Sequence, residues 1–70
     1  MAERRRYLIC YDIAHPRRWR RIFRLVRDYA RPLQYSVFIG ELSPVEVEQL
    51  WGELSALIDP DADRVHCLPL

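Results

Sequence analysis

Apolar side chains are spaced in two different ways in the first half of the chain. Residues 7–13 (YLICYDI) form a continuous apolar, aromatic and β-branched run that only Asp12 interrupts, which predicts a central strand buried on both faces. From residue 17 to about residue 30, apolar positions recur at the spacing of an amphipathic helix. Pro16 suits the first turn of that helix, and Pro32 is expected to end it.

The next segment predicts more strand and then a second helix. Residues 33–42 (LQYSVFIGEL) are rich in β-branched and aromatic side chains, so they form either one bent strand or two short ones. Ser43, Pro44 and Glu46 follow in the pattern of a helix start, with Ser43 as the N-cap and Glu46 completing a capping box. This is the clearest boundary in the sequence.

Helical spacing of apolar residues continues until Asp59 and Pro60, which are expected to end the second helix. Residues 64–70 (RVHCLPL) then predict a last strand. Trp19 and Trp51 fall on the apolar faces of the two predicted helices, and we interpret both as core residues.

This order of elements predicts a single α+β domain over residues 1–70, with an antiparallel sheet, both helices on one face and right-handed crossovers. If the middle segment holds two strands, the fold is a ferredoxin-like βαββαβ sandwich. A chain this short buries only about 60% of its unfolded surface on folding, so it needs a disulfide, a metal or a partner subunit. We therefore expect self-association.

Charge is distributed unevenly along the chain. All eleven basic residues are arginine and ten of them precede residue 32, whereas seven of the ten acidic residues lie from Glu41 onward. On a helix, five of these arginines fall in one stripe, with Arg21 beside it and Asp28 as the one acidic neighbour. The stripe consists of Arg17, Arg20, Arg24, Arg27 and Arg31. Together with Arg18 and Arg21, it is our predicted phosphate-binding surface. The alternative is a charged face that only contacts solvent.

Two further features leave alternatives open. The basic run Arg4 to Arg6 could be a mobile arm or a frayed terminus. Cys10 and Cys67 lie in apolar runs without metal-ligand spacing, so we interpret them as small buried hydrophobes, although a disulfide between paired strands is conceivable. The sequence has no export signal and no run long enough to span a membrane, so a reducing cytoplasm is the expected location.

Several segments together resemble the CRISPR-associated protein 2 family: YLICYDI closing on Asp12, the arginine-rich helix, QYSVFIGELSP and the terminal DRVHCLPL. The resemblance implies a ferredoxin-like fold and a homodimer packed through the sheets, with two Asp12 side chains facing each other across the twofold axis. It also implies a role in antiviral defence, either as a metal-dependent endonuclease acting on RNA or DNA, or as the non-catalytic bridge of the complex that integrates DNA spacers. An integrase subunit is then an expected partner.

The sequence departs from the family pattern at four places. His15 stands where a second acidic residue is common, and Trp19 and Pro32 occupy positions where arginine is frequent. Family members usually continue beyond Leu70 with a strand that crosses onto the partner subunit, so we expect that this strand is either lacking or truncated.

Asp12 is the candidate catalytic residue and metal ligand. An unpaired carboxylate is costly to bury, so Asp12 must be exposed, paired or metal-bound. Two copies brought together by a dimer axis could hold one Mg²⁺ ion, which accepts one or two carboxylates and keeps most of its waters. The alternatives are that Asp12 caps the following helix or pairs with an arginine.

Three neighbours are weaker candidates for a supporting role. His15 could act as a proton donor, although a loop histidine is more often simply exposed. Ser36 could position water or phosphate beside Asp12, as the resemblance implies. Tyr11 could support the same site, but Tyr11, Tyr35 and Phe38 are better interpreted as core or interface aromatics than as base-stacking residues.

An RNA-binding or toxin-type ferredoxin-like domain outside CRISPR systems is the remaining hypothesis for the function of the protein.

Overall fold

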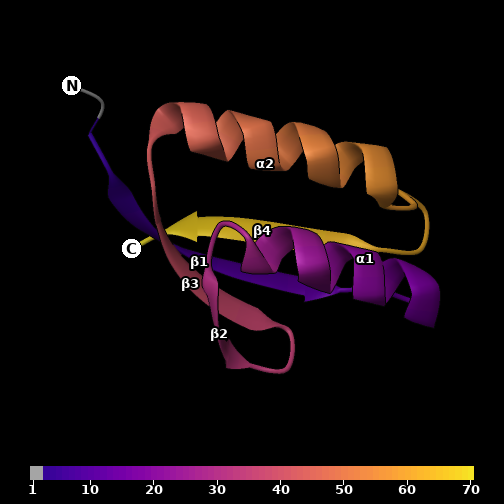
Figure 1. Cartoon of the computed structure of the whole chain (residues 1–70). Coiled ribbons are helices and arrows are strands. Elements are labelled where there is room, and N and C mark those ends of the chain that lie inside the picture. Colours follow the sequence, from indigo (N-terminus) through magenta and orange to yellow (C-terminus); the bar gives the residue numbers. More distant parts are fainter. Residues whose placement is uncertain (1–2) are drawn as a thin grey trace.

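The computed structural model of the chain describes residues 3–70. The elements follow one another in the order β1, α1, β2, β3, α2 and β4, as Figure 1 shows. Their bounds are β1 Arg5–Asp12, α1 Pro16–Arg27, β2 Arg31–Gln34, β3 Val37–Leu42, α2 Pro44–Leu57 and β4 Arg64–Pro69. The middle segment therefore holds two strands, which confirms the βαββαβ order.

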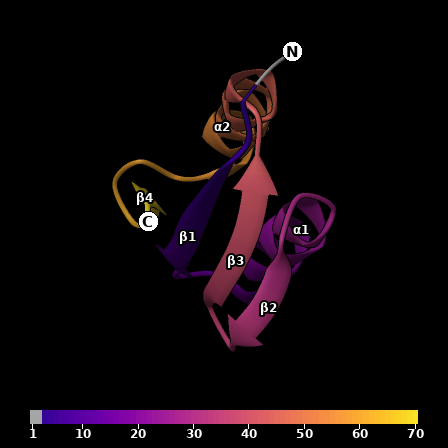
Figure 2. The same cartoon turned by 90° about the vertical axis from the view of Figure 1, so that its left-hand side faces the viewer.

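The four strands form one antiparallel sheet in the order β2-β3-β1-β4. Figure 2 shows the sheet as a single layer with both helices on the same side of it. This is the ferredoxin-like sandwich that the sequence predicts. The strand β1 is central, as expected from its continuous apolar run.

Alternation along the strands divides the sheet into two faces. On the helix-bearing face, Ile9 and Phe38 lie opposite each other in the register and are fully buried, and they pack with Ile22 and Leu50 of the helices. The other side, which we call the open sheet face, carries the remaining alternate residues and has no covering layer within residues 3–70. Its apolar members are Leu8, Cys10, Val37, Ile39 and Leu68. The prediction that β1 is buried on both faces is therefore wrong for the single chain.

Helix α1 ends three residues earlier than predicted, and Pro32 is not what ends it. Asp28 is the C-cap, and its N–H bonds to carbonyls of the last helical turn. Arg31 then opens β2 opposite Ile39, because a residue that precedes proline is disfavoured in the helical region of backbone space. The expectation that Arg31 continues the helical arginine stripe is consequently wrong.

Helix α2 begins with the predicted capping box. The Ser43 hydroxyl accepts from the Glu46 N–H at 3.2 Å, and the Glu46 carboxylate accepts from the Ser43 N–H at 2.9 Å. Trp51, however, is 45% exposed and is not a core residue. Leu50 and Leu54 already occupy the line of closest approach to the sheet, and Trp51 is about 100° around the helix from Leu50. Trp19 packs against the core as predicted, although only partly buried.

Both cysteines are free and half-buried. Their strands do pair, but Cys10 lies opposite His66 and Cys67 lies opposite Ile9. Cys10 and Cys67 therefore emerge on opposite faces of the sheet, which rules out the disulfide between them. Burial raises the pKa of the Cys67 thiol, so this side chain behaves as a small apolar group.

The run from Arg4 to Arg6 is neither a mobile arm nor a frayed end. Arg5 and Arg6 are the first residues of β1. Arg4 donates to the Glu41 carbonyl at 2.7 Å and forms an ion pair of 2.7 Å with Glu46 at the start of α2. Strand pairing and these contacts, which the basic composition does not reveal, tie the segment to β3 and α2.

A methyl group in place of hydrogen at Gly40 is expected to destabilise the fold. An added Cβ would lie 2.8 Å from the Ala30 Cβ and 3.0 Å from the Tyr29 carbonyl oxygen, where the turn between α1 and β2 passes close to β3. Gly40→Ala should lower the free energy of unfolding by about 1–3 kcal/mol, the usual range for overpacking. Urea denaturation followed by circular dichroism measures the change.

Gly52→Ala is the matched control, because the same methyl group meets nothing within 4 Å on the exposed side of α2. Alanine favours a helix interior over glycine, so this variant should gain roughly 0.5–1 kcal/mol. Equal stabilities for the two variants would contradict the close approach at Gly40.

Candidate functional site

The carboxylate of Asp63 joins the segments that surround the end of β1. It accepts from the Ala14 N–H at 2.9 Å, from the Asp59 N–H at 2.9 Å and from the Arg18 guanidinium at 2.8 and 3.3 Å. Asp63 is only 3% exposed. One side chain thus fixes the loop after β1, the first turn of α1 and the turn that leads into β4.

These contacts stabilise the charged form of Asp63. The Arg18 guanidinium, aided by the Asp59 and Ala14 N–H groups, outweighs burial and holds the pKa of Asp63 well below its usual range. The same pairing raises the pKa of Arg18 further above its ordinary value. Arg18 is therefore engaged at Asp63 and stands apart from the other arginines of α1.

Asp12 is exposed at the end of β1 and belongs to the open sheet face, since it alternates with Ile9 and Tyr11 of the core. Asp12 neither caps the following helix nor pairs with an arginine, which were the two alternatives to metal binding. The N-cap of α1 is His15, and none of the ion pairs among residues 3–70 involves Asp12. Arg64 lies opposite it in the register, but the Arg64 guanidinium donates to the carbonyls of Pro60 and Asp63.

A groove of about 400 Å³ opens beside Asp12, at the junction of β1, the start of α1 and the β2–β3 turn. We call it the Asp12 groove. It brings together three residues that the sequence analysis singled out for chemistry, namely Asp12, Arg20 and Ser36. Its other lining residues are Ile13, Ala14, Pro16, Trp19 and Tyr35.

The supporting candidates are placed very differently from one another. Ser36 lines the groove, and its hydroxyl accepts from the Trp19 indole N–H at 3.4 Å. His15 is exposed outside the groove lining, and its Nδ1 accepts from the Arg17 N–H at 3.2 Å. Tyr11 points into the core on the face opposite Asp12, where its ring stacks on Phe38 with centroids 5.9 Å apart.

The Tyr11 hydroxyl is buried without a hydrogen-bond partner among residues 3–70. Burial, with a smaller contribution from Tyr35, raises the pKa of Tyr11 to about 12. This hydroxyl stays protonated at neutral pH, and its position inside the core separates it from the Asp12 carboxylate.

Helix α1 presents a surface of unneutralised positive charge. Arg17, Arg20, Arg21, Arg24 and Arg27 are all exposed, and none of the ion pairs within residues 3–70 includes them. We call these five residues the α1 arginine face. The Arg27 guanidinium lies over the Phe23 ring, 5.7 Å from its centroid.

Two features of this region were missed by the sequence analysis. The sequence does not single out Asp63, because nothing local to residues 59–63 reveals an arginine partner 45 positions away. Tyr35 is 75% exposed, so the core alternative of its predicted core or interface role is wrong. Its place just after Gln34, where the middle segment must turn if it forms two strands, was the available signal.

No group of three or more histidine, cysteine, aspartate or glutamate side chains among residues 3–70 is arranged to hold a metal ion. An exposed carboxylate held by no ion pair does match the donor that Mg²⁺ takes, provided that a second carboxylate and water complete the shell.

Within residues 3–70, neither helix is both long and apolar enough to cross a bilayer.

The fold and the groove define a small α+β protein of the ferredoxin-like class. Residues 5–70 match the family model described as CRISPR associated protein Cas2. The chain belongs to this family, as its sequence resemblance indicated.

Relatives and solved structures agree with this assignment. The chain is 42% identical over 64 residues to "CRISPR-associated endoribonuclease Cas2 2" of Nitrosomonas europaea, covering 91% of this chain and 57% of that protein. A protein of the same name from Thermodesulfovibrio yellowstonii is 38% identical over 64 residues, covering 91% of this chain and 70% of that protein. The chain thus spans little more than half the length of the first of these relatives.

Solved structures superpose closely on the chain. The Cas2 crystal structure from Streptococcus pyogenes has a TM-score of 0.86 at 28% identity, covering 93% of this chain and 84% of that one. A hypothetical protein from Thermus thermophilus gives a TM-score of 0.93 at 28% identity, covering 96% of this chain and 82% of that one.

Removing the Asp63 carboxylate is expected to destabilise the protein in a pH-dependent way. Asp63→Asn leaves at least one buried donor unsatisfied, which should lower the free energy of unfolding by about 2–3 kcal/mol at neutral pH. Because the folded pKa of Asp63 is depressed, its contribution is present above the unfolded pKa of about 4 and is lost as the pH falls toward the folded value. The wild type and the variant should therefore converge in stability as the pH is lowered from about 5 to about 2.

Thermal unfolding across that pH range measures the effect. Asp61→Asn, which removes an exposed carboxylate from the same turn, serves as the control and should follow the wild type. A stability gap between wild type and Asp63→Asn that does not change with pH would contradict the pairing.

Proposed function

We propose that this chain acts in CRISPR adaptation and antiviral defence as a homodimer that binds nucleic acid and cleaves phosphodiester bonds of RNA with Mg²⁺. The observation that carries the proposal is the exposed Asp12 carboxylate at the mouth of a groove, in a chain whose relatives are named endoribonucleases. An integrase subunit is the further partner that this role requires.

The open sheet face supports the homodimer. It carries the apolar side chains Leu8, Val37, Ile39 and Leu68 in adjacent strands, and Leu68 is 49% exposed. An isologous contact through this face would bury these side chains and add to the core that so short a chain needs. Asp12 belongs to the same face, so a twofold axis near the end of β1 would bring two copies of it together.

Two Asp12 carboxylates are a sufficient protein donor set for one Mg²⁺ ion, which keeps several of its waters. When bound, that ion supplies an activated water and stabilises negative charge on the phosphodiester. The chain's own residues do the positioning. Arg20 in the groove offers a guanidinium to a phosphate oxygen, and the Ser36 hydroxyl offers a second polar contact.

A second candidate function is a non-catalytic scaffold that bridges duplex DNA during spacer integration. The α1 arginine face favours it, because guanidinium groups spaced along a helix can contact successive phosphates of a backbone. This function needs the arginines but not Asp12. The nuclease function, in contrast, requires the Asp12 carboxylate, so the two functions differ in their need for Asp12.

Asp12→Asn should abolish cleavage while leaving binding intact. The substitution removes the negative charge that would hold Mg²⁺ but keeps the shape of the side chain, so cleavage of labelled single-stranded RNA should fall to the level of a protein-free sample. Gel analysis of the products, with Mg²⁺ or with a chelator, measures this. Asp61→Asn is the control for loss of one exposed carboxylate and should cut like the wild type.

If Asp12→Asn cuts RNA as fast as the wild type, the catalytic role of Asp12 is wrong. If neither protein cuts RNA or DNA but both bind duplex DNA, the scaffold function stands in its place.

Loss of two charges from the α1 arginine face should weaken duplex binding. Each phosphate contact contributes about 0.9 to the slope of log K against log salt, so Arg20→Gln/Arg24→Gln should reduce that slope by about two. Fluorescence anisotropy of a labelled duplex over a range of salt concentrations measures the slope.

The double variant Arg4→Gln/Arg5→Gln removes the same charge from the residue before β1 and the first residue of β1, and it serves as the control. An equal reduction of the slope in both double variants would show that net charge, and not the α1 arginine face, governs binding.

A further inference from the structure

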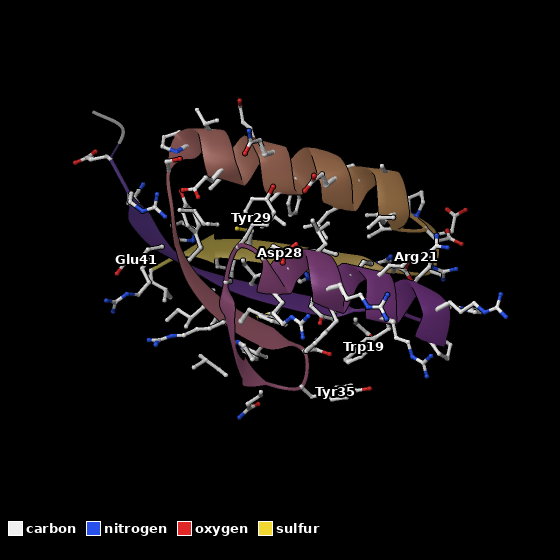
Figure 3. The ribbon with its side chains drawn as sticks, viewed as in Figure 1. Trp19, Arg21, Asp28, Tyr29, Tyr35 and Glu41 are labelled. Atoms are coloured by element: carbon white, nitrogen blue, oxygen red, sulfur yellow. The ribbon has the colours of Figure 1, made fainter. Side chains whose placement is uncertain are left out.

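Three aromatic rings form a continuous stack from the core to the surface. Phe23 meets the buried Phe38 edge to face, with centroids 5.6 Å apart. Trp19 stacks on Phe23 at 5.1 Å, and Tyr35 stacks on Trp19 at 4.7 Å, with interplanar angles of 18° in both pairs. Figure 3 shows the end of this stack, with Trp19 lying between α1 and the Tyr35 ring.

Tyr35 is the solvent end of the stack. One face of its ring is covered by Trp19, yet the residue is 75% exposed, the highest exposure of any large hydrophobic side chain in residues 3–70. Ordinary core packing does not account for an aromatic ring in this position, because most of its surface stays in water. The outer side of the ring is left available to another flat group.

The stack is held in place from two sides. The Trp19 indole N–H donates to the hydroxyl of Ser36, the residue next to Tyr35, at 3.4 Å. Tyr11, whose N–H donates to the Ser36 carbonyl at 3.2 Å, anchors the same turn to β1. A preorganised ring loses little conformational freedom when a ligand stacks on it.

Tyr35 shares the Asp12 groove with Asp12 and Arg20. A group stacked on Tyr35 would therefore lie next to a groove whose lining also contains the Asp12 carboxylate and the Arg20 guanidinium. Nucleotides match this combination, since each has a flat base joined to an anionic phosphate.

The aromatic stack lies on the helix-bearing side of the sheet, away from the proposed dimer contact. Trp19 belongs to α1, which packs on the face opposite the open sheet face. A dimer formed through the open sheet face would leave the stacked aromatic rings on the other side of the sheet.

We infer that the outer face of Tyr35 is a subsite for an unpaired nucleobase, which places the adjoining phosphodiester of single-stranded RNA in the Asp12 groove. The inference rests on the proposed function and names the residue that would hold a base of its substrate. In a duplex the base faces are stacked on one another and cannot reach the ring, so the subsite selects single strands, loops or ends. Tyr35 is thus a positioning residue, distinct from the α1 arginine face that serves phosphates of either form.

The test compares three variants by anisotropy of labelled oligoadenylate RNA and of a matched duplex, in a chelator so that nothing is cut. Stacking on an aromatic side chain is lost in Tyr35→Ala and in Tyr35→Leu, so both should bind the single strand roughly 5- to 150-fold more weakly. Tyr35→Phe should bind like the wild type, because the ring remains. Duplex binding should be the same in all four proteins.

An abasic nucleotide in the oligomer tests the stacking directly. The abasic nucleotide is moved along the strand, one position at a time. At one position it should weaken binding by the wild type as much as the Tyr35→Ala substitution does. The same abasic oligomer should bind Tyr35→Ala about as tightly as the intact oligomer does. Leu33→Ala and Trp51→Ala remove other exposed apolar side chains and should leave binding of the single strand unchanged.

Three results would overturn the inference: no loss in Tyr35→Ala, the same loss for single strand and duplex, or a loss in Tyr35→Phe as large as in Tyr35→Ala. A change of dimerisation in Tyr35→Ala, measured by sedimentation, would assign the ring to a contact between copies and would also overturn it. These binding results do not depend on cleavage. Failure of the Asp12→Asn experiment would therefore refute the catalytic function and leave the base subsite to be judged on its own.

Discussion

The buried carboxylate of Asp63 is the interaction on which the geometry of the candidate site depends. Its partners come from the loop after β1, from α1 and from the turn before β4. Ala14 and Arg18 lie 49 and 45 positions from Asp63 in the sequence, so this one carboxylate ties the strand end and the helix start to the distant turn before β4. Because the carboxylate is paired with Arg18 and bonded to two backbone N–H groups, its burial is tolerated. Through its hydrogen bond to the Ala14 N–H, this side chain holds one of the segments that line the Asp12 groove.

The alternation of β1 explains how a core and a site are built from adjacent residues. Ile9 and Tyr11 point toward the helices, whereas Cys10 and Asp12 point to the open sheet face. Asp12 can therefore be exposed although it directly follows a buried tyrosine. The fixed position of Tyr11 under the β2–β3 turn then places Tyr35 and Ser36 beside the strand end. Core packing and site geometry are consequences of the same register.

Local signals predicted the elements well, and long-range contacts account for what they missed. The capping box at Ser43 needs only neighbouring residues, so its prediction was confirmed. The end of α1 depends on how the chain turns into β2, which is why Arg31 was wrongly placed on the helix. Exposure of Trp51 and Tyr35, and burial of Asp63, are decided by which segments meet in space. The spacing of apolar residues within one segment does not reveal which other segments it contacts in the folded chain.

In the proposed function, the aromatic stack and the α1 arginine face contact different parts of a nucleic acid. Guanidinium groups contact phosphates, which both single strands and duplexes present, and therefore contribute affinity without choosing between them. An exposed ring contacts a base, which only an unpaired nucleotide can offer. Since Arg20 lines the same groove as Tyr35, the two kinds of contact meet at one point on the surface. With the arginine face alone, a chain would bind single strands and duplexes alike, whereas the proposed base subsite on Tyr35 would favour single strands.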